Sequence, residues 1–267
     1  MISGKTRVFA ILGAPVAHSL SPAMQNAAFR ALGLDAVYVP LLTRPDDVAS
    51  LMRALARAGG GGNVTVPHKE AAAAAVDRPA DRVRALGVCN TFWGDDGAVH
   101  GDNTDVDGVL AALARLDAPS GGWLVIGTGG GARAAVAAAK ERGASVAVRS
   151  RDDGRARAFG EWAAGIGVAA TDPATCDVAI NTTPLGLKPN DAHPLPAGEL
   201  GRISVALDMV YAAGATPWVR GLQARGIRAA DGREMLLAQG AAAFTRWFPR
   251  VRPPIEIMRA ALNAGLR

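Results

Sequence analysis

A glycine-rich segment, GTGGGAR at residues 127–133, has the residue types and spacing that bind the phosphates of a dinucleotide. It follows an apolar run at residues 123–126, which predicts a buried strand, and it opens an alanine-rich stretch that predicts a helix. In that setting Gly127 allows a tight turn, Gly129 lets the backbone approach a pyrophosphate, and Ala132 keeps the helix close to the strand. The free N–H groups of the helix N-terminus favour an anion. A plain glycine-rich turn is the alternative, and the flanking strand and helix favour the nucleotide site.

The position about 20 residues further on decides which dinucleotide fits. A site for NAD places Asp or Glu at the end of the second strand, where it accepts a hydrogen bond from the ribose 2′-hydroxyl. This chain has Arg149, Ser150 and Arg151 there, and its first acid is Asp152. Because guanidinium groups pair with a 2′-phosphate, the sequence favours NADP, with ordinary surface arginines as the alternative. We expect Asp152 to point outward, as the first residue or the cap of the next helix.

Several polar side chains in the first part of the chain are suited to binding a small ligand. They are Ser19, Ser21, Asn63, Thr65, Lys69, Asn90 and Asp105. Each lies at or just beyond the end of a predicted strand, where open α/β sheets bind ligands. Each also has an ordinary interpretation by itself, such as a helix N-cap for Ser21, a solvated lysine for Lys69 and a helix cap for Asp105. Residue types alone leave both interpretations open.

Short apolar runs alternate with longer segments rich in Ala and Leu, which predicts an α/β protein with parallel sheets covered by helices. The predicted strands of the first part cover residues 8–12, 38–42, 63–66, 88–93 and 98–101, with a hairpin turn at 95–97. Those of the second part cover residues 123–126, 146–148, 176–180 and 204–207. We therefore predict an N-terminal α/β substrate domain at 1–105 and a Rossmann-type doubly wound domain at 106–239, with a cleft between them. The C-terminal helices, within 240–267, are expected to pack back on the first domain.

Composition excludes several classes of protein. The two cysteines, Cys89 and Cys176, are too few for a disulfide scaffold or a zinc ribbon, and we predict no metal site. The net charge is +5, but the basic residues are dispersed and not interleaved with aromatic ones, so we expect no nucleic-acid partner. No apolar run approaches the roughly 20 residues of a membrane span, and the residue types at 1–5 lead us to expect no export signal. We expect a cytoplasmic monomer or homodimer without a membrane partner.

Eight motifs give the sequence a resemblance to a known family. They are GAPVAHSLSPAMQN (13–26), GNVTVPHKE (62–70), GVCNTFW (87–93), GDNTD (101–105), GTGGGAR (127–133), NTTPLG (181–186), DMVY (208–211) and DGREMLLAQ (231–239). In their order and in their spread over nearly the whole chain they resemble the shikimate dehydrogenase family. The resemblance implies an oxidoreductase that interconverts 3-dehydroshikimate and shikimate with NADP, in the pathway to chorismate and the aromatic amino acids.

The same resemblance implies roles for individual residues. Lys69 and Asp105 would be the catalytic pair, and Ser19 and Ser21 would hold the substrate carboxylate. The remaining substrate-binding residues would be Asn63, Thr65, Asn90, Tyr211 and Gln239. The cofactor-binding residues would be Gly127, Thr128, Gly129, Gly130, Gly131, Ala132, Arg133, Ser150, Arg151, Arg155, Thr182, Thr183, Met209 and Gly232.

The chain departs from the family pattern at a few positions. Asp152 stands where Thr is usual and places a carboxylate near the expected phosphate, whereas Cys89 and Val106 touch no expected chemical role. The nearest alternative function is an enzyme of the same family that acts on quinate or an amino-shikimate. A nicotinamide-binding regulator without turnover is the other alternative, and the presence of both Lys69 and Asp105 speaks against it.

Overall fold

The computed structural model describes residues 2–188 and 190–266, and the chain divides into two compact units. Unit 1 comprises Met1–Asp105 and Leu236–Arg267, and unit 2 comprises Val106–Met235. Unit 2 ends ahead of the predicted limit at 239, because helix α9 (Arg233–Trp247) continues unbroken and its later residues enter the core of unit 1. The predicted outer limits, residues 1 and 267, lie outside the described residues.

Unit 1 is built on a six-stranded mixed sheet with the strand order β2-β1-β3-β5-β6-β4. Its strands are β1 (Arg7–Gly13), β2 (Ala36–Leu42), β3 (Gly61–Val64), β4 (Arg78–Pro79), β5 (Thr91–Asp95) and β6 (Ala98–Asp102). The first three strands are parallel, whereas β5 runs antiparallel to both β3 and β6. The predicted hairpin turn joins β5 to β6, and Asp96 and Gly97 take the positive φ angles, 48° and 74°, that its tight turn requires.

Strand β3 begins and ends earlier than the strand predicted at 63–66. Its first two residues are glycines, which give no hydrophobic signal in the sequence. They are nevertheless buried against β1, where a Cβ on Gly62 would lie 2.0 Å from the carbonyl oxygen of Ala10. After Val64 the chain turns, and the N–H of His68 donates to the carbonyl of Thr65 at 2.9 Å. The polar residues that follow β3 therefore lie in a turn at the carboxyl end of the strand.

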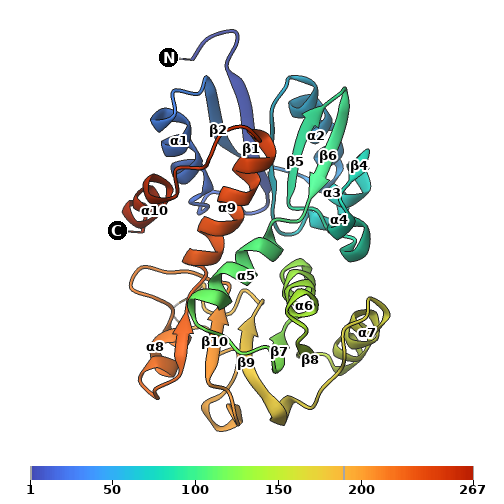
Figure 1. Ribbon diagram of the computed structural model, residues 1–267, viewed down its shortest axis with the longest axis vertical. Coiled ribbons are helices and arrows are strands. Elements are labelled where there is room, and N and C mark those ends of the chain that lie inside the picture. The colour runs from blue at the N-terminus through green and yellow to red at the C-terminus, as the bar shows by residue number, and fades with distance from the viewer. Residues whose placement is uncertain (1, 189, 267) are drawn as a thin grey trace. The chain divides into compact units, whose positions relative to one another are not determined.

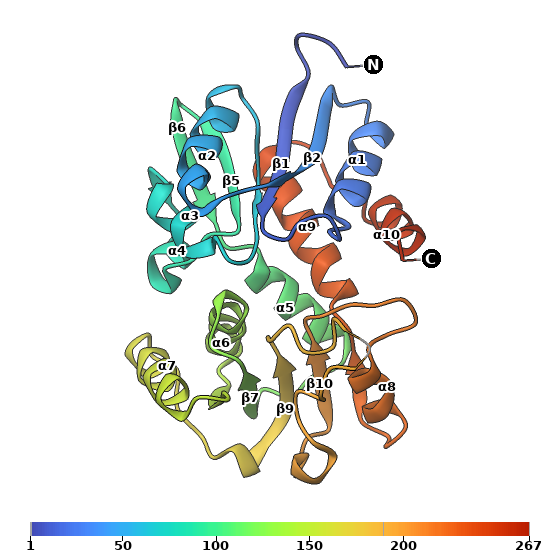
Figure 2. The same cartoon turned by 180° about the vertical axis from the view of Figure 1, so that it is seen from behind.

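Alternate residues of β1 point to two hydrophobic cores, one on each face of the sheet. On one face, Phe9 packs with residues of α1 (Ser21–Ala31), α9 and α10 (Ile255–Ala264), and α10 runs beside α1 (Figure 2). On the other face, Leu12 packs with residues of α2 (Val48–Arg57), α3 (Lys69–Ala75) and α4 (Asp81–Leu86) (Figure 1). The aromatic core of the first face combines residues from both ends of the chain.

The prediction that Ser21 is a helix N-cap is wrong. Helix α1 begins at Ser21, its N-cap position is Leu20, and no side-chain hydrogen bond caps it. The reason lies in the backbone, because Leu20 already has the helical angles φ −90° and ψ −3°, so that Ser21 is the first residue of the helix. The Ser21 hydroxyl therefore does not contribute to stability as an N-cap.

Unit 2 contains a five-stranded parallel sheet with the order β11-β10-β9-β7-β8. Its strands are β7 (Gly122–Ile126), β8 (Ser145–Arg149), β9 (Cys176–Asn181), β10 (Val205–Asp208) and β11 (Arg228–Ala230). Its helices are α5 (Asp105–Arg115), α6 (Gly130–Arg142), α7 (Asp153–Gly165) and α8 (Pro217–Gln223). The strand order reverses direction beside β7, which confirms the predicted Rossmann-type α/β class. Within the described residues, no helix is long and apolar enough to cross a membrane.

A buried carboxylate, Asp208, ties together three segments at the carboxyl end of the unit 2 sheet. It accepts hydrogen bonds from Asn181 at the end of β9 (2.8 Å), from Thr216 before α8 (2.7 Å) and from the N–H of Val210 (3.1 Å). Burial nevertheless dominates these hydrogen bonds and raises the pKa of Asp208 from 3.8 to about 6.

This raised pKa predicts a pH-dependent loss of stability. Between about pH 4 and pH 6 the folded state binds a proton at Asp208 that the unfolded chain has released, so the contribution of Asp208 to stability falls as pH rises through this window. The free energy of unfolding of Asp208→Asn, relative to that of the unmodified protein, should rise by up to about 3 kcal/mol between pH 4 and pH 7. Urea unfolding of both proteins at the two pH values measures the difference. A constant difference in unfolding free energy would contradict the raised pKa.

Candidate active site and dinucleotide site

Lys69 and Asp105 form an ion pair within unit 1. Lys69 is the first residue of α3, directly after the turn that follows β3, and Asp105 is the first residue of α5, shortly after β6. The Lys69 Nζ donates to the Asp105 Oδ2, and their side chains are only 14% and 9% exposed. The two charged groups, at the starts of α3 and α5, are thus brought together where little water reaches them.

Asn90 holds the second oxygen of the Asp105 carboxylate. Its Nδ2 donates to Asp105 Oδ1 at 2.8 Å, while its Oδ1 accepts from the backbone N–H of Thr104 at 2.7 Å. Gln239 of α9 extends the group, with its Oε1 at 3.5 Å from the Asn90 Nδ2. Each carboxylate oxygen of Asp105 therefore has a donor, and the carboxylate is held as an acceptor.

Asn63 joins the same network from β3. Its Nδ2 donates to the carbonyl of Asn90 at 3.1 Å and to the Thr91 Oγ1 at 2.9 Å. Its Oδ1 accepts from the hydroxyl of Tyr38 at 2.8 Å. The hydrogen bonds of unit 1 therefore connect five of the predicted site residues, Asn63, Lys69, Asn90, Asp105 and Gln239.

Thr65 directly follows the carboxyl end of β3, which adjoins that of β1, whereas Ser19 and Ser21 lie between β1 and the first turn of α1. The N–H of Ser21 donates to the Ser19 Oγ at 3.3 Å, and the N–H of Thr65 donates to the carbonyl of Leu12 at 2.8 Å. Gly13 lets these ends approach, because a Cβ there would lie 2.4 Å from the Thr65 Cγ2. Within the described residues, no side-chain hydrogen bond joins Ser19 or Ser21 to the network formed by Lys69, Asp105 and Asn90.

Ser19→Ala and Ser21→Ala should each raise KM for an acid substrate about tenfold or more and spare kcat. A hydrogen bond to a charged group contributes roughly 1.5–3 kcal/mol, and binding that is equal in ground and transition states affects KM alone. Steady-state kinetics at saturating cofactor measure both constants, with Ser50→Ala in α2 as the matched control. A large fall in kcat at unchanged KM would contradict a role on the carboxylate.

The glycine-rich segment of unit 2 forms the turn that the sequence predicts. Gly127 has φ +116°, and a Cβ there would lie 2.4 Å from the Thr182 Oγ1. The N-cap of α6 is Gly129, and a Cβ on Gly131 would lie 3.1 Å from the Met209 Sδ. The backbone between β7 and α6 is therefore in contact with the ends of β9 and β10, and the glycines at 129–131 keep the N-terminus of α6 open to a pyrophosphate.

Two of the predicted cofactor residues, Thr182 and Thr183, contact this turn from the end of β9. The Thr182 Oγ1 donates to the carbonyl of Ile126 at 2.8 Å, and the Thr183 Oγ1 donates to the Asn181 Oδ1 at 2.7 Å. Gly232 approaches the chain after β10 so closely that a Cβ would lie 2.3 Å from the Met209 carbonyl oxygen. Thr182, Thr183 and Met209 thus lie against the loop after β7, and Gly232 packs on the backbone of Met209, an arrangement that fits a dinucleotide.

The loop after β8 presents the arginines. Asp152 is the N-cap of α7, and its Oδ1 accepts from the N–H of Arg155 at 2.9 Å, which confirms the expected helix cap. Arg151 is exposed, and the Arg155 side chain is 77% exposed, with its Nε 3.9 Å from the Asp152 Oδ2. Arg149, in contrast, forms an ion pair with Glu199. The guanidinium of Arg151 is therefore better placed than that of Arg149 to meet a phosphate.

Comparison with known proteins decides the family. Residues 11–92 match the model of the shikimate dehydrogenase substrate-binding domain, and residues 232–262 match that of the shikimate 5′-dehydrogenase C-terminal domain. The NADP⁺ shikimate dehydrogenase of Methanothermobacter thermautotrophicus is 38% identical, over 100% of this chain and 99% of that protein. The chain belongs to the shikimate dehydrogenase family. This confirms the resemblance seen in the motifs.

Solved structures of shikimate dehydrogenases have the same fold. One in complex with NADP⁺ superposes with a TM-score of 0.91 at 29% identity and covers 100% of this chain and 98% of its own. That from Thermus thermophilus, in complex with NADP(H) and shikimate, has a TM-score of 0.86 at 33% identity, with full coverage of both chains.

Sequence reasoning missed three residues in this shikimate dehydrogenase homologue that organise the predicted site. Tyr38, Thr91 and Thr104 are buried and hydrogen-bonded within the network around Asn63 and Asn90. Two of them carry a readable signal, since Thr91 and Thr104 each adjoin a predicted site residue in the motifs GVCNTFW and GDNTD. Tyr38 carries none, because it reads as an ordinary strand residue.

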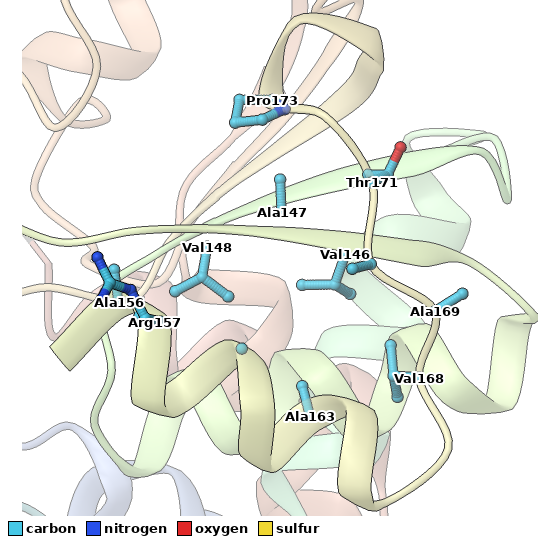
Figure 3. Close-up of a pocket in the computed structure, with 12 residues that line it drawn as sticks. Val146, Ala147, Val148, Ala156, Arg157, Ala163, Val168, Ala169, Thr171 and Pro173 are labelled. Carbon is cyan, nitrogen blue, oxygen red and sulfur yellow. The ribbon is translucent and has the colours of Figure 1, made fainter. Parts of the chain in front are cut away.

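A separate apolar cavity of about 250 Å³ lies beside the edge strand β8 (Figure 3). Val146 and Val148 of the strand line it, together with Ala163 of α7 and the following segment at 168–173. None of its lining residues belongs to the predicted substrate or cofactor sets. In the described part of the chain, no group of three His, Cys, Asp or Glu side chains is arranged to hold a metal ion.

Proposed function

We propose that this protein is an NADP-dependent shikimate dehydrogenase, which interconverts 3-dehydroshikimate and shikimate. The observation that carries the proposal is the largely buried ion pair between Lys69 and Asp105 at the strand ends of unit 1. Membership of the family and the open glycine loop of unit 2 support the same activity. The proposal includes the place of this reaction in the pathway to chorismate and the aromatic amino acids.

Lys69 would carry the proton of the reaction. A positioned ammonium can give a proton to the carbonyl oxygen in reduction and regain it in oxidation. Asp105 would hold the Lys69 Nζ in place through its Oδ2, and Asn90 would hold the carboxylate through its Oδ1. Lys69 would thus transfer the proton at its Nζ, with Asp105 holding that atom in place. Ser19 and Ser21 would bind the carboxylate at the other end of the substrate.

The residues of unit 2 fit an NADP molecule. The loop at 127–131 and the N-terminus of α6 would hold the pyrophosphate, and Arg151 with Arg155 would hold the 2′-phosphate. The chemistry that NADP supplies when bound is hydride transfer at the nicotinamide ring. Thr182, Thr183 and Met209 would shape the remainder of this site, as their contacts around the loop suggest.

One set of steady-state assays tests the proposal against its alternatives. The purified protein is supplied with NADP⁺ or NAD⁺, each with shikimate or quinate. We expect the highest kcat/KM with NADP⁺ and shikimate. A higher value with quinate would assign the chain to the quinate-oxidising alternative, and cofactor binding without any turnover would indicate the regulator. The proposal includes a cytoplasmic monomer or homodimer that has no nucleic-acid partner.

A further inference from the structure

We propose that Tyr38 is a positioning residue for Asn63, which makes the Asn63 side chain a pure hydrogen-bond acceptor toward the substrate. The inference rests on the proposed function and adds to it a residue and a requirement on the substrate. Tyr38 lies on β2 and is buried, and its hydroxyl donates to the Asn63 Oδ1 at 2.8 Å.

The orientation of the Asn63 amide is fixed by a backbone group. The carbonyl of Asn90 can only accept, so the nitrogen of the Asn63 amide must face it, at 3.1 Å. The second N–H of that nitrogen donates to the Thr91 Oγ1 at 2.9 Å. Both donors of Asn63 are therefore used, and its oxygen faces Tyr38, which must donate.

The position of the Tyr38 hydroxyl is itself held by neighbouring elements. The side chain of Asn26 on α1 pairs with both backbone groups of Tyr38, accepting from its N–H at 2.9 Å and donating to its carbonyl at 2.7 Å. The ring packs against Trp247 of α9, with 5.9 Å between ring centroids. Burial raises the pKa of Tyr38 well above its ordinary value, which keeps the hydroxyl protonated and able to donate.

This arrangement determines what Asn63 can recognise. An amide oxygen has two acceptor sites, and Tyr38 occupies one, so the other can accept one further hydrogen bond. Asp105 is likewise held as an acceptor by Lys69 and Asn90. A substrate group that meets Asn63 must therefore be a hydrogen-bond donor, as a ring hydroxyl of shikimate is, and a carbonyl in that place would be rejected because it cannot donate.

Tyr38→Phe tests the proposal, because it removes the hydroxyl and keeps the ring. With the Asn63 side chain less restrained, KM for shikimate should rise about three- to tenfold, as the loss of one ordinary hydrogen bond predicts. KM for NADP⁺ and kcat should change less than about twofold, since Tyr38 acts on ground-state substrate binding. Thr43→Val is the matched control, because it removes another buried hydroxyl near the end of β2, which donates to the carbonyl of Leu41.

A double-mutant cycle separates positioning from a purely structural role. In an Asn63→Ala background, Tyr38→Phe should raise KM no further, because the residue through which it acts is gone. Equal increases in both backgrounds, or an unchanged KM for shikimate in a folded Tyr38→Phe protein, would overturn the proposal. If Tyr38→Phe does not fold, Asn26→Ala releases the backbone of Tyr38 and should raise the same KM, and an unchanged value there overturns it as well. Absence of shikimate oxidation in the unmodified protein would instead refute the proposed function.

Discussion

Replacing Lys69 with alanine should lower kcat for shikimate oxidation by about 10²–10⁴-fold, the usual cost of removing a general acid or base. Shikimate binding should remain, because the serines and Asn63 are untouched. The change also leaves the Asp105 carboxylate with Asn90 as its donor instead of two donors. Single-turnover rates and equilibrium binding of shikimate measure chemistry and binding separately.

Lys5→Ala, which removes an exposed lysine of the same unit, is the control for this experiment. Asp105→Asn should cause a loss similar to that of Lys69→Ala, and the double variant should be little worse than either one. Groups that act as a unit do not contribute independently, so the effects should be far from additive. A near-normal kcat for Lys69→Ala would show that another group carries the proton.

NADP⁺ should be preferred over NAD⁺ at least tenfold in kcat/KM, and Arg151→Ala should remove most of that preference while barely changing the kinetics with NAD⁺. A guanidinium pairs with a doubly charged phosphate through two hydrogen bonds, and each bond to a charged group contributes roughly 1.5–3 kcal/mol. The exposed Arg151 follows β8 at the place where such a phosphate is expected. Steady-state kinetics with both cofactors at saturating shikimate test this.

Two neighbouring substitutions sharpen the cofactor experiment. Arg149→Ala should alter the preference less, because its guanidinium is paired with Glu199. Asp152→Ala should cost about 1 kcal/mol of stability through the lost cap of α7 rather than change the preference. Equal kcat/KM for the two cofactors in the unmodified protein would contradict the role of Arg151 and would make Asp152 the residue to examine as a ribose ligand.

The dinucleotide loop and the general fold could be predicted from sequence because they depend on local patterns. Gly127 needs a positive φ, and the strand and helix beside it are strongly patterned, so a short window contains the whole signal. The N-cap at Asp152 is equally local. Ser21 has the same kind of signal, yet its predicted role as an N-cap is wrong, because Leu20 already has helical angles and takes the N-cap position.

The organisation of the candidate active site could not be predicted in this way. Tyr38 and Asn63, which are hydrogen-bonded, are 25 residues apart in the sequence, and the paired Arg149 and Glu199 are 50 residues apart. A short sequence window therefore does not show either pairing. The direction of each hydrogen bond also depends on backbone groups, such as the carbonyl of Asn90, whose orientation only the folded sheet determines. The family resemblance indicated the candidate site residues, and the folded structure shows the hydrogen bonds between them.

The composition of unit 1 from both ends of the chain has a consequence for how the protein is made. Phe9 is synthesised before unit 2, whereas Phe244 and Phe248, its partners in the aromatic core, are synthesised after it. Unit 2 is one continuous stretch, 106–235, and can complete its fold before the second segment of unit 1 has been made. The sheet of unit 1, whose strand ends precede the candidate catalytic residues, must therefore wait with part of one face uncovered until residues 237–262 have been synthesised.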